Sequence, residues 1–181
     1  MTERILHDGK AINEAIKRLA AEIVDGESQP PALIGIRTHG VPLAQRLADA
    51  MEARGVGRPP LGAIDITLYR DDLAGKALPQ VLGSEINFDI EGRRVVLVDD
   101  VLFTGRTVRA ALTELADYGR PHRVELCVLV DRGHRELPIC ADFSGFTVET
   151  ELKQRIRVHL KESGDAQDAV VLVKPEADSR A

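Results

Sequence analysis

VVLVDDVLFTGRT, from Val95 to Thr107, sets two adjacent carboxylates and a glycine turn directly after a run of apolar residues. Such a run predicts a strand that is buried on both faces. Gly105 permits a tight turn, and a helix is expected to begin near Thr107. The backbone amides of residues 104–107 then lie at a helix N-terminus, where the peptide dipoles favour an anion. The stretch therefore predicts a strand, a turn that holds one phosphate, and a helix.

Asp99 and Asp100 cannot bind that phosphate, because like charges repel. They can accept hydrogen bonds from two vicinal hydroxyls of a sugar, and they can stabilise positive charge that develops at its anomeric carbon. A helix-capping aspartate with a neighbouring surface charge is the alternative interpretation. Since the acid pair stands between an apolar strand and Thr-Gly-Arg-Thr, we favour ribose 5-phosphate as the ligand. The turn is not a P-loop, because the glycine spacing and the lysine of that motif are absent.

The rest of the chain alternates helical and strand patterns. Helices are predicted over residues 12–23 (capped by Asp8), 42–54 and 107–118, and strands over 32–36, 61–69, 93–98 and 123–130. Shorter apolar segments follow at 139–143, 146–150, 155–160 and 169–174. Apolar strands that alternate with helices indicate an α/β fold with a parallel sheet covered on both faces. In such sheets ligands bind beyond the carboxyl ends of the strands.

Composition limits the classes of function. A chain of 181 residues, 44% apolar and 29% charged, suits one globular domain. With only 3% aromatic residues the chain favours an aliphatic α/β core over a stacking platform for RNA bases, and with a net charge of −5 any contact with nucleic acid would need a local basic patch. Cys127 and Cys140 lie in apolar stretches and are expected to be reduced core thiols. Without an apolar run of membrane-spanning length or a signal-peptide pattern, we expect a cytoplasmic protein with no membrane partner.

Three stretches resemble a known family. Val95–Thr107 resembles the 5-phosphoribosyl-1-pyrophosphate (PRPP) motif of the type I phosphoribosyltransferases. DITLYRDDL (Asp65–Leu73) and VDRGHRELPI (Val130–Ile139) are similar to the pyrimidine-operon attenuation proteins, which are also uracil phosphoribosyltransferases. The resemblance runs from the first helix to about Gly145.

The resemblance implies a fold and an activity. The fold would be a single α/β domain over residues 1–181, with a central parallel sheet flanked by helices. A flexible lid would span about residues 69–92, a small hood would combine the N-terminal and 132–160 segments, and the tail at 175–181 would be frayed. The reaction would convert uracil and PRPP to UMP and pyrophosphate, with Mg²⁺ entering with PRPP. The further partners implied are the pyr mRNA leader and other copies of the chain, in a dimer or tetramer.

The resemblance also implies site residues. Arg37, Thr38, His39 and Gly40 would hold the diphosphate, and Arg70 would close over it as a catalytic residue beside Asp99 and Asp100. The acid pair, Val101, Leu102, Phe103, Thr104, Gly105, Arg106 and Thr107 would hold the ribose 5-phosphate. Arg132, Phe146 and Val148 would face the base, and Asp131 would support the metal.

The chain also departs from the family's pattern. Relatives place an arginine at His39, where a neutral imidazole would donate one hydrogen bond and carry less charge. After Gly145 they carry Gly-Lys-Asn-x-Pro-Thr-Ser, with an arginine at Cys140, whereas this chain reads GFTVETE. Loss of cations weakens RNA binding, which depends on phosphate neutralisation. The remaining basic candidates for RNA are Lys17, Arg18, Lys153, Arg155 and Arg157. A nucleotide sensor without turnover and a purine phosphoribosyltransferase stay open as alternatives.

Overall fold

The main sheet positions every strand end that the sequence analysis singled out. The structure, a computed structural model, describes residues 2–67 and 81–174. Within these ranges the main sheet is parallel and has the order β3-β2-β4-β5-β6. Its strands are β2 (Ala32–Ile36), β3 (Leu61–Ile64), β4 (Arg94–Leu102), β5 (Arg123–Asp131) and β6 (Phe143–Thr147). The carboxyl ends of β2, β4, β5 and β6 are therefore neighbours along one edge.

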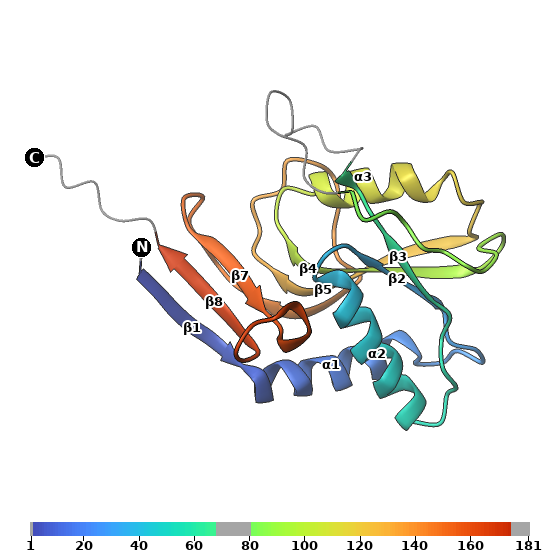
Figure 1. Cartoon of the computed structure of the whole chain (residues 1–181), viewed down its shortest axis with the longest axis horizontal. Helices are drawn as coiled ribbons and strands as arrows, with labels where there is room; N and C mark the ends of the chain where they lie inside the picture. The colour runs from blue at the N-terminus through green and yellow to red at the C-terminus, as the bar shows by residue number, and fades with distance from the viewer. Residues whose placement is uncertain (1, 68–80, 175–181) are drawn as a thin grey trace, which may run out of the picture.

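Alternation of side chains along the strands builds two cores, one on each face of the main sheet. Val96 and Val98 of β4 pack with helices α1 (Gly9–Ile23) and α2 (Gly40–Ala53). Val95 and Leu97 pack on the opposite face with helix α3 (Arg106–Leu115). Because both faces of the strand are covered, β4 is apolar at every position from Val95 to Val98. Figure 1 shows α1 and α2 on one side of the sheet and α3 on the other.

A second, antiparallel sheet lies beside the main one. It consists of β1 (Thr2–Asp8), β8 (Ala169–Lys174) and β7 (Arg155–His159), in that order. A short 3-10 helix, η2 (Lys161–Ser163), begins the loop from β7 to β8. In Figure 1 this sheet extends from the start of α1, away from α3. This sheet differs in composition from the predicted hood of the N-terminal and 132–160 segments. It includes β8, which lies beyond residue 160, and it lacks β6, which belongs to the main sheet.

Several predicted elements have the expected bounds, and two end early. Asp8 caps α1 as predicted, since its Oδ1 accepts a hydrogen bond of 2.8 Å from the amide of Ala11. The strand predicted over 61–69 ends at Ile64, because the carboxylate of Asp65 then takes the amides of Thr67, Leu82 and Gly83. The helix predicted to reach residue 118 ends at Leu115, in a turn of i to i+3 hydrogen bonds.

Two further expectations need correction or lie outside the described residues. Cys127 is a buried thiol as expected, but Cys140 is exposed, so the prediction of a second core thiol is wrong. Strand β1 has no counterpart in the sequence-based prediction. The first half of the predicted lid, residues 69–80 with Arg70, and the predicted frayed tail fall outside the described residues. Across 2–67 and 81–174, no helix combines the length and the apolar character needed to cross a membrane.

Candidate functional site

The turn after β4 is shaped to receive an anion. Gly105, at the N-cap of α3, has a φ of 93°, in the left-handed region that glycine adopts most easily. A Cβ there would lie 3.3 Å from the Cβ of Ile139, so the position is also crowded. Gly105 has no side chain to cap α3, and the amide of Arg106 donates to Oγ1 of Thr104 over a long 3.4 Å. An uncapped helix N-terminus at a strand end is the feature that binds phosphate in many folds.

The segment after β5 braces this turn. The amides of Glu136 and Leu137 donate to the carbonyl oxygen of Thr104 over 3.0 and 3.2 Å. The guanidinium of Arg135 donates to the carbonyl oxygen of Phe103 over 2.7 Å. Because carbonyl oxygens at the turn are engaged on this side, the turn is held in one conformation without using its amides. The structure thus joins two stretches that the sequence analysis assigned to separate roles.

The acid pair lies near the carboxyl end of β4, and its two members have different surroundings. Asp99 is buried, and its Oδ1 accepts a hydrogen bond of 2.9 Å from the amide of Asp100. Burial, followed by the charge of Asp100, raises the pKa of Asp99 well above its usual value. Asp100 is more exposed, with Oδ1 on the amide of Val101 and Oδ2 2.9 Å from Nδ1 of His39. Asp100 is therefore the acid with the charge and access to meet sugar hydroxyls.

The loop between β2 and α2 lies against β4, as the parallel order requires. A Cβ on Gly40 would lie 2.2 Å from the carbonyl oxygen of Val98, so only glycine fits this approach. The peptide bond between Arg37 and Thr38 is cis. Arg37 turns away from β4, since its guanidinium donates to the carbonyl oxygen of Gly83 and to Glu85 over 2.8 and 2.9 Å. His39 instead turns toward Asp100, which makes it the basic side chain of this loop in contact with the acid pair.

The electrostatic surroundings of His39 favour its charged form. The hydrogen bond with Asp100 is the largest influence and raises the pKa of His39, while partial burial opposes it. The charges of Asp100 and of Asp165, in the loop after η2, add to the increase. The net direction is upward, so the neutral imidazole expected from the sequence is disfavoured here.

The residues predicted around the base and the metal are already engaged within the protein. Asp131 accepts the amide of Gly133 over 2.9 Å and forms an ion pair with Arg135. Arg132 is buried, its guanidinium carbon 3.9 Å from the centre of the Phe103 ring. Its guanidinium also donates to Thr150 over 3.2 Å, and burial lowers its pKa. In the part of the chain that the structure describes, no group of three potential metal-ligating side chains converges.

Phe146 and Val148 lie at the end of β6, beside the end of β5. The ring of Phe146 stacks on the imidazole of His7 with 3.7 Å between centroids, which links the main sheet to β1. The amide of Val148 donates to the carbonyl oxygen of Asp131 over 2.9 Å. One face of Phe146 is thus covered by His7, an arrangement that the sequence offered no signal for.

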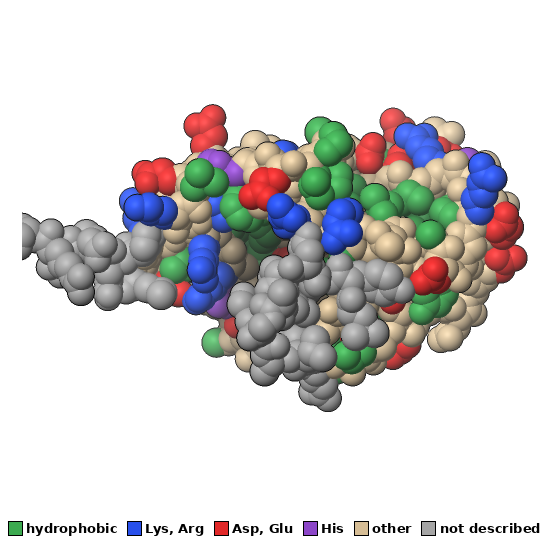
Figure 2. Space-filling model, turned by 90° about the horizontal axis from the view of Figure 1, so that it is seen from above, with side chains coloured by type: hydrophobic (Ala, Val, Ile, Leu, Met, Phe, Trp, Pro, Cys, Tyr) green, Lys and Arg blue, Asp and Glu red, His purple; other side chains and the backbone are tan. Residues whose placement is uncertain are grey.

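The basic residues considered for RNA are largely held by partners inside the protein. Arg18 donates to the carbonyl oxygen of Gly145 over 2.6 Å and to Glu22 over 2.9 Å. Lys17 pairs with Glu14 over 2.8 Å, and Arg157 pairs with Glu3 over 3.1 Å. On the face that Figure 2 shows, basic and acidic side chains are interspersed.

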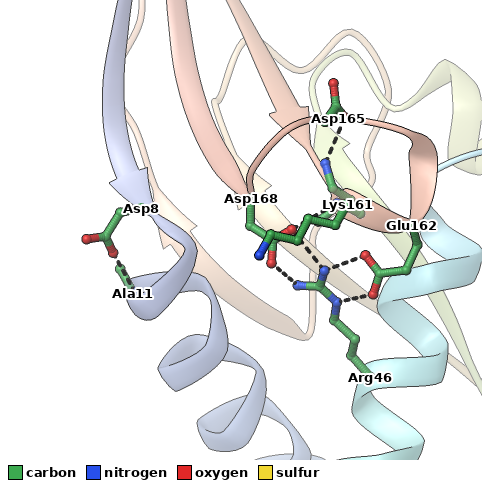
Figure 3. Close-up of polar contacts among 8 residues, drawn as sticks. Asp8, Ala11, Arg46, Lys161, Glu162, Asp165 and Asp168 are labelled. Carbon is green, nitrogen blue, oxygen red and sulfur yellow. Dashed lines mark hydrogen bonds and ion pairs between the residues drawn. The ribbon is translucent and has the colours of Figure 1, made fainter.

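A polar cluster that was not predicted from the sequence joins α2 to the loop between β7 and β8 (Figure 3). Arg46 forms two-pronged ion pairs with Glu162 and Asp168, with contacts of 2.5 to 3.0 Å. The amide of Lys161 donates to Asp168 over 2.9 Å. These partners are more than a hundred residues apart in the chain, so neither spacing nor periodicity could reveal them.

A groove lies beside this cluster rather than at the phosphate turn. Its volume is about 1020 Å³, and it is bordered by α1, α2 and the loop that ends at Ala169. Lys10, Lys17, Arg54 and Lys161 line it together with acids. Those acids are held internally: Asp8 caps α1, Asp49 pairs with Arg58, and Glu162 and Asp168 bind Arg46.

Comparison with known proteins gives consistent results. The phosphoribosyl transferase domain family matches residues 3–162. The chain is 50% identical to the bifunctional protein PyrR of Roseiflexus sp. over 182 residues, 99% of this chain and 100% of that protein. It is 48% identical to the bifunctional protein PyrR of Listeria welshimeri over 179 residues, 95% of this chain and 97% of that protein.

Solved structures resemble the fold. The hypoxanthine phosphoribosyltransferase of Trypanosoma cruzi matches with a TM-score of 0.70 at 20% identity, covering 96% of this chain and 97% of that one. A hypoxanthine-guanine phosphoribosyltransferase from Bacillus anthracis matches with a TM-score of 0.65 at 19% identity, covering 83% and 86%. At such low identity the likeness concerns the fold, and base preference does not transfer from it.

Proposed function

The chain belongs to the PyrR family of phosphoribosyl transferase domain proteins, and on that premise we propose that it converts uracil and PRPP to UMP and pyrophosphate. We further propose that it binds the leader of pyr messenger RNA. The observation that carries the enzymatic half is the uncapped N-terminus of α3, directly after the acid pair of β4. It offers a phosphate site and a hydroxyl site side by side, as ribose 5-phosphate requires.

The proposed roles follow the edge of the sheet. The amides of residues 104–107 hold the 5-phosphate, and Asp100, with Asp99 behind it, accepts hydrogen bonds from the ribose hydroxyls. The loop 37–40 at the end of β2 holds the diphosphate. Uracil then lies toward Phe146 and Val148 at the end of β6, the remaining strand end on that side. Arg132, buried beneath Phe103, supports this wall.

The chemistry we propose is mainly positioning and electrostatic stabilisation. The reaction breaks the bond from the anomeric carbon to the diphosphate oxygen and forms one to the base nitrogen, whose N–H proton is released. Positive charge develops on the sugar between these events, and the carboxylate of Asp100 stabilises it. The turn and the 37–40 loop hold the two ends of the substrate so that the anomeric carbon is fixed.

Magnesium fits this proposal as part of the substrate. Both carboxylate oxygens of Asp131, the predicted metal ligand, already have partners in Gly133 and Arg135. Mg²⁺ prefers oxygen ligands that include substrate phosphates and water. We therefore propose that it enters on the diphosphate of PRPP, where it neutralises charge on the leaving group. The proposed closure of Arg70 over that diphosphate concerns residues outside the described ranges and remains a prediction.

The enzymatic half is tested by a base panel. Purified protein with PRPP and Mg²⁺ is given uracil, hypoxanthine or guanine, and nucleotide formation is followed by chromatography. We expect UMP alone to accumulate. Formation of a purine nucleotide instead would establish the purine alternative. Tight binding of UMP without any product would establish a sensor that has lost turnover.

The regulatory half rests on family membership and on the groove beside α1. Five basic side chains line that groove, of which Arg46 is held by Glu162 and Asp168, and the acids that line it have internal partners. We propose that RNA phosphates contact Lys10, Lys17 and Lys161 there. A gel shift with the pyr leader should show binding that weakens steeply with salt. An unshifted leader at micromolar protein in low salt would contradict this half alone.

A further inference from the structure

We propose that His39 holds the substrate diphosphate as an imidazolium, which its hydrogen bond with Asp100 chiefly stabilises and the charge of Asp165 in the loop after η2 further favours. The inference rests on the proposed function, because it takes the ligand of the 37–40 loop to be a diphosphate. It adds a titrating group and a remote positioning residue, Asp165, to that site. The consequence is diphosphate binding that weakens as the pH rises.

Nδ1 of His39 forms a hydrogen bond of 2.9 Å with Oδ2 of Asp100. A carboxylate oxygen can only accept, so Nδ1 has to carry the proton. In a neutral imidazole the other nitrogen, Nε2, is then a bare acceptor, and it would repel a diphosphate oxygen. Only the imidazolium has a second N–H to donate. The single hydrogen bond that a neutral His39 can donate is thus already used on Asp100.

The loop between β2 and α2 contains two basic residues, Arg37 and His39. Arg37 is directed to Glu85 and to the carbonyl oxygen of Gly83. The loop therefore depends on His39 for a positive charge beside Asp100. A charged donor binds a diphosphate oxygen about twice as strongly as a neutral one.

Two acids favour the charged form of His39. Asp100 on β4 and Asp165 on the loop between β7 and β8 are the acids whose charges act on it. Asp165 itself is held in place, since it accepts from Nδ1 of His159 over 2.8 Å and from the amide of Leu160 over 2.9 Å. The hydrogen bond with His159 lowers the pKa of Asp165, so Asp165 stays ionised near neutral pH.

The loop that bears Asp165 is attached to α2, the helix whose N-cap is His39. Arg46 of α2 binds both Glu162 and Asp168, on either side of Asp165 in the sequence (Figure 3). One helix therefore carries His39 at its start and clamps the loop that bears Asp165. Pairing through two carboxylates fixes the position of the loop more firmly than a single exposed ion pair would.

The direct test is an NMR titration of the wild-type histidine rings, with His39 assigned by its loss in His39→Gln. We expect His39 to titrate above the ordinary value of about 6.5. In Asp165→Asn its pKa should fall toward that value, while Asp25→Asn, which removes an exposed acid that does not act on His39, should leave it unchanged. A wild-type value at or below about 6.5, or an Asp165→Asn value equal to wild type, would overturn the proposal.

The second measurement is the binding of inorganic pyrophosphate by calorimetry between about pH 6 and about pH 9, which needs no turnover. The comparison is His39→Arg, which carries a permanent charge, so that the titration of pyrophosphate itself cancels in the ratio. We expect the ratio of the wild-type dissociation constant to that of His39→Arg to rise by about tenfold or more from the lowest to the highest pH. The reason is that wild-type His39 loses one charged hydrogen bond to pyrophosphate as it is deprotonated. A constant ratio would overturn the proposal. Absence of UMP formation beside a rising ratio would instead count against the proposed transferase reaction.

Discussion

Asp99 and Asp100 are adjacent in the sequence but differ in burial and in their hydrogen-bond partners. Asp99 is buried with a raised pKa, whereas Asp100 reaches His39 and keeps access to solvent. Adjacent residues on a strand point to opposite faces, which explains how two acids one position apart differ so much. The ionisation of Asp99 is therefore resisted by the protein, and Asp100 is the acid that we propose meets the ligand.

Asp99→Asn tests that difference through stability. The folded protein raises the pKa of Asp99, so the contribution of Asp99 to stability is present at low pH and is lost as the pH rises through the folded pKa. Removing the ionisable group should stabilise the protein at pH 7 by more than the ~0.5 kcal/mol typical of neutral surface substitutions. Urea unfolding at pH 7 and at acid pH measures this. An equal effect at both pH values would contradict the assigned cause.

Gly105→Ala tests the phosphate turn. A left-handed φ costs a residue with a Cβ about 1–2 kcal/mol, and here the Cβ also meets Ile139. Gly55→Ala is a matched control, because Gly55 has a φ of 79° and nothing within 4 Å of the added Cβ. We expect both variants to lose stability in urea unfolding, but only Gly105→Ala to raise the KM for PRPP. A raised KM in both would show that the effect is not local to the turn.

At the scale of elements, most of the main sheet followed from local pattern. Strands β2, β4 and β5 contain continuous runs of buried apolar residues, and Gly105 and Asp8 mark helix starts by their own chemistry. Strand β6, FSGFT, lacks such a run and spans the gap between two of the predicted segments. Strand β1 could not be predicted in this way, because its residues are mostly exposed and it is stabilised by pairing with β8, at the other end of the chain. Cys140 was misjudged because an apolar neighbourhood in sequence does not reveal a loop that faces solvent.

The candidate site also has a part that the sequence predicts and a part that it does not. Segments 37–40, 99–107 and 131–132 could be placed at strand ends from the order of strands alone. Asp165, Arg46 and the stacking of His7 on Phe146 come from contacts between the two sheets or between α2 and a distant loop. Such contacts depend on how elements pack, and a single sequence contains no periodic signal for them.

Arg46→Lys tests the link between α2 and the loop from β7 to β8. A lysine cannot bind two carboxylates in the two-pronged way of arginine. We expect a loss of about 1–3 kcal/mol in urea unfolding, since Asp168 is largely buried. The loss should shrink at acid pH, because the lowered pKa of Asp168 means that its contribution disappears as the pH falls through the folded value.

Arg58→Lys is the control for this substitution. Arg58 also binds two acids, Asp49 and Glu52, but all three side chains are well exposed. Exposed pairs contribute about 0–1 kcal/mol. Equal losses for Arg46→Lys and Arg58→Lys would contradict the role given to the buried clamp.

For the whole molecule, the predicted family and the α/β phosphoribosyltransferase fold are confirmed. The net charge of −5 means that any RNA has to be attracted by local cations against an unfavourable overall field. The predicted homo-oligomer stays a prediction. Sedimentation at micromolar concentration would check it, with a dimer or tetramer as the expected result.

The salt dependence of RNA binding tests the groove as a unit. Three phosphate contacts on a single-stranded leader predict a slope of about −2 in log affinity against log salt. Replacing Lys10, Lys17 and Lys161 by alanine should bring that slope close to zero, while alanine at the exposed Lys174 should preserve it. An unchanged slope in the triple variant would place the RNA elsewhere on the protein.

The central claim is that the turn after β4 and its acid pair hold ribose 5-phosphate. A crystal structure of the protein with UMP tests this most directly. The account predicts the phosphate on the amides of residues 104–107 and the ribose hydroxyls at Asp100. A nucleotide bound in the groove between α1 and α2, or with its phosphate away from the start of α3, would contradict it.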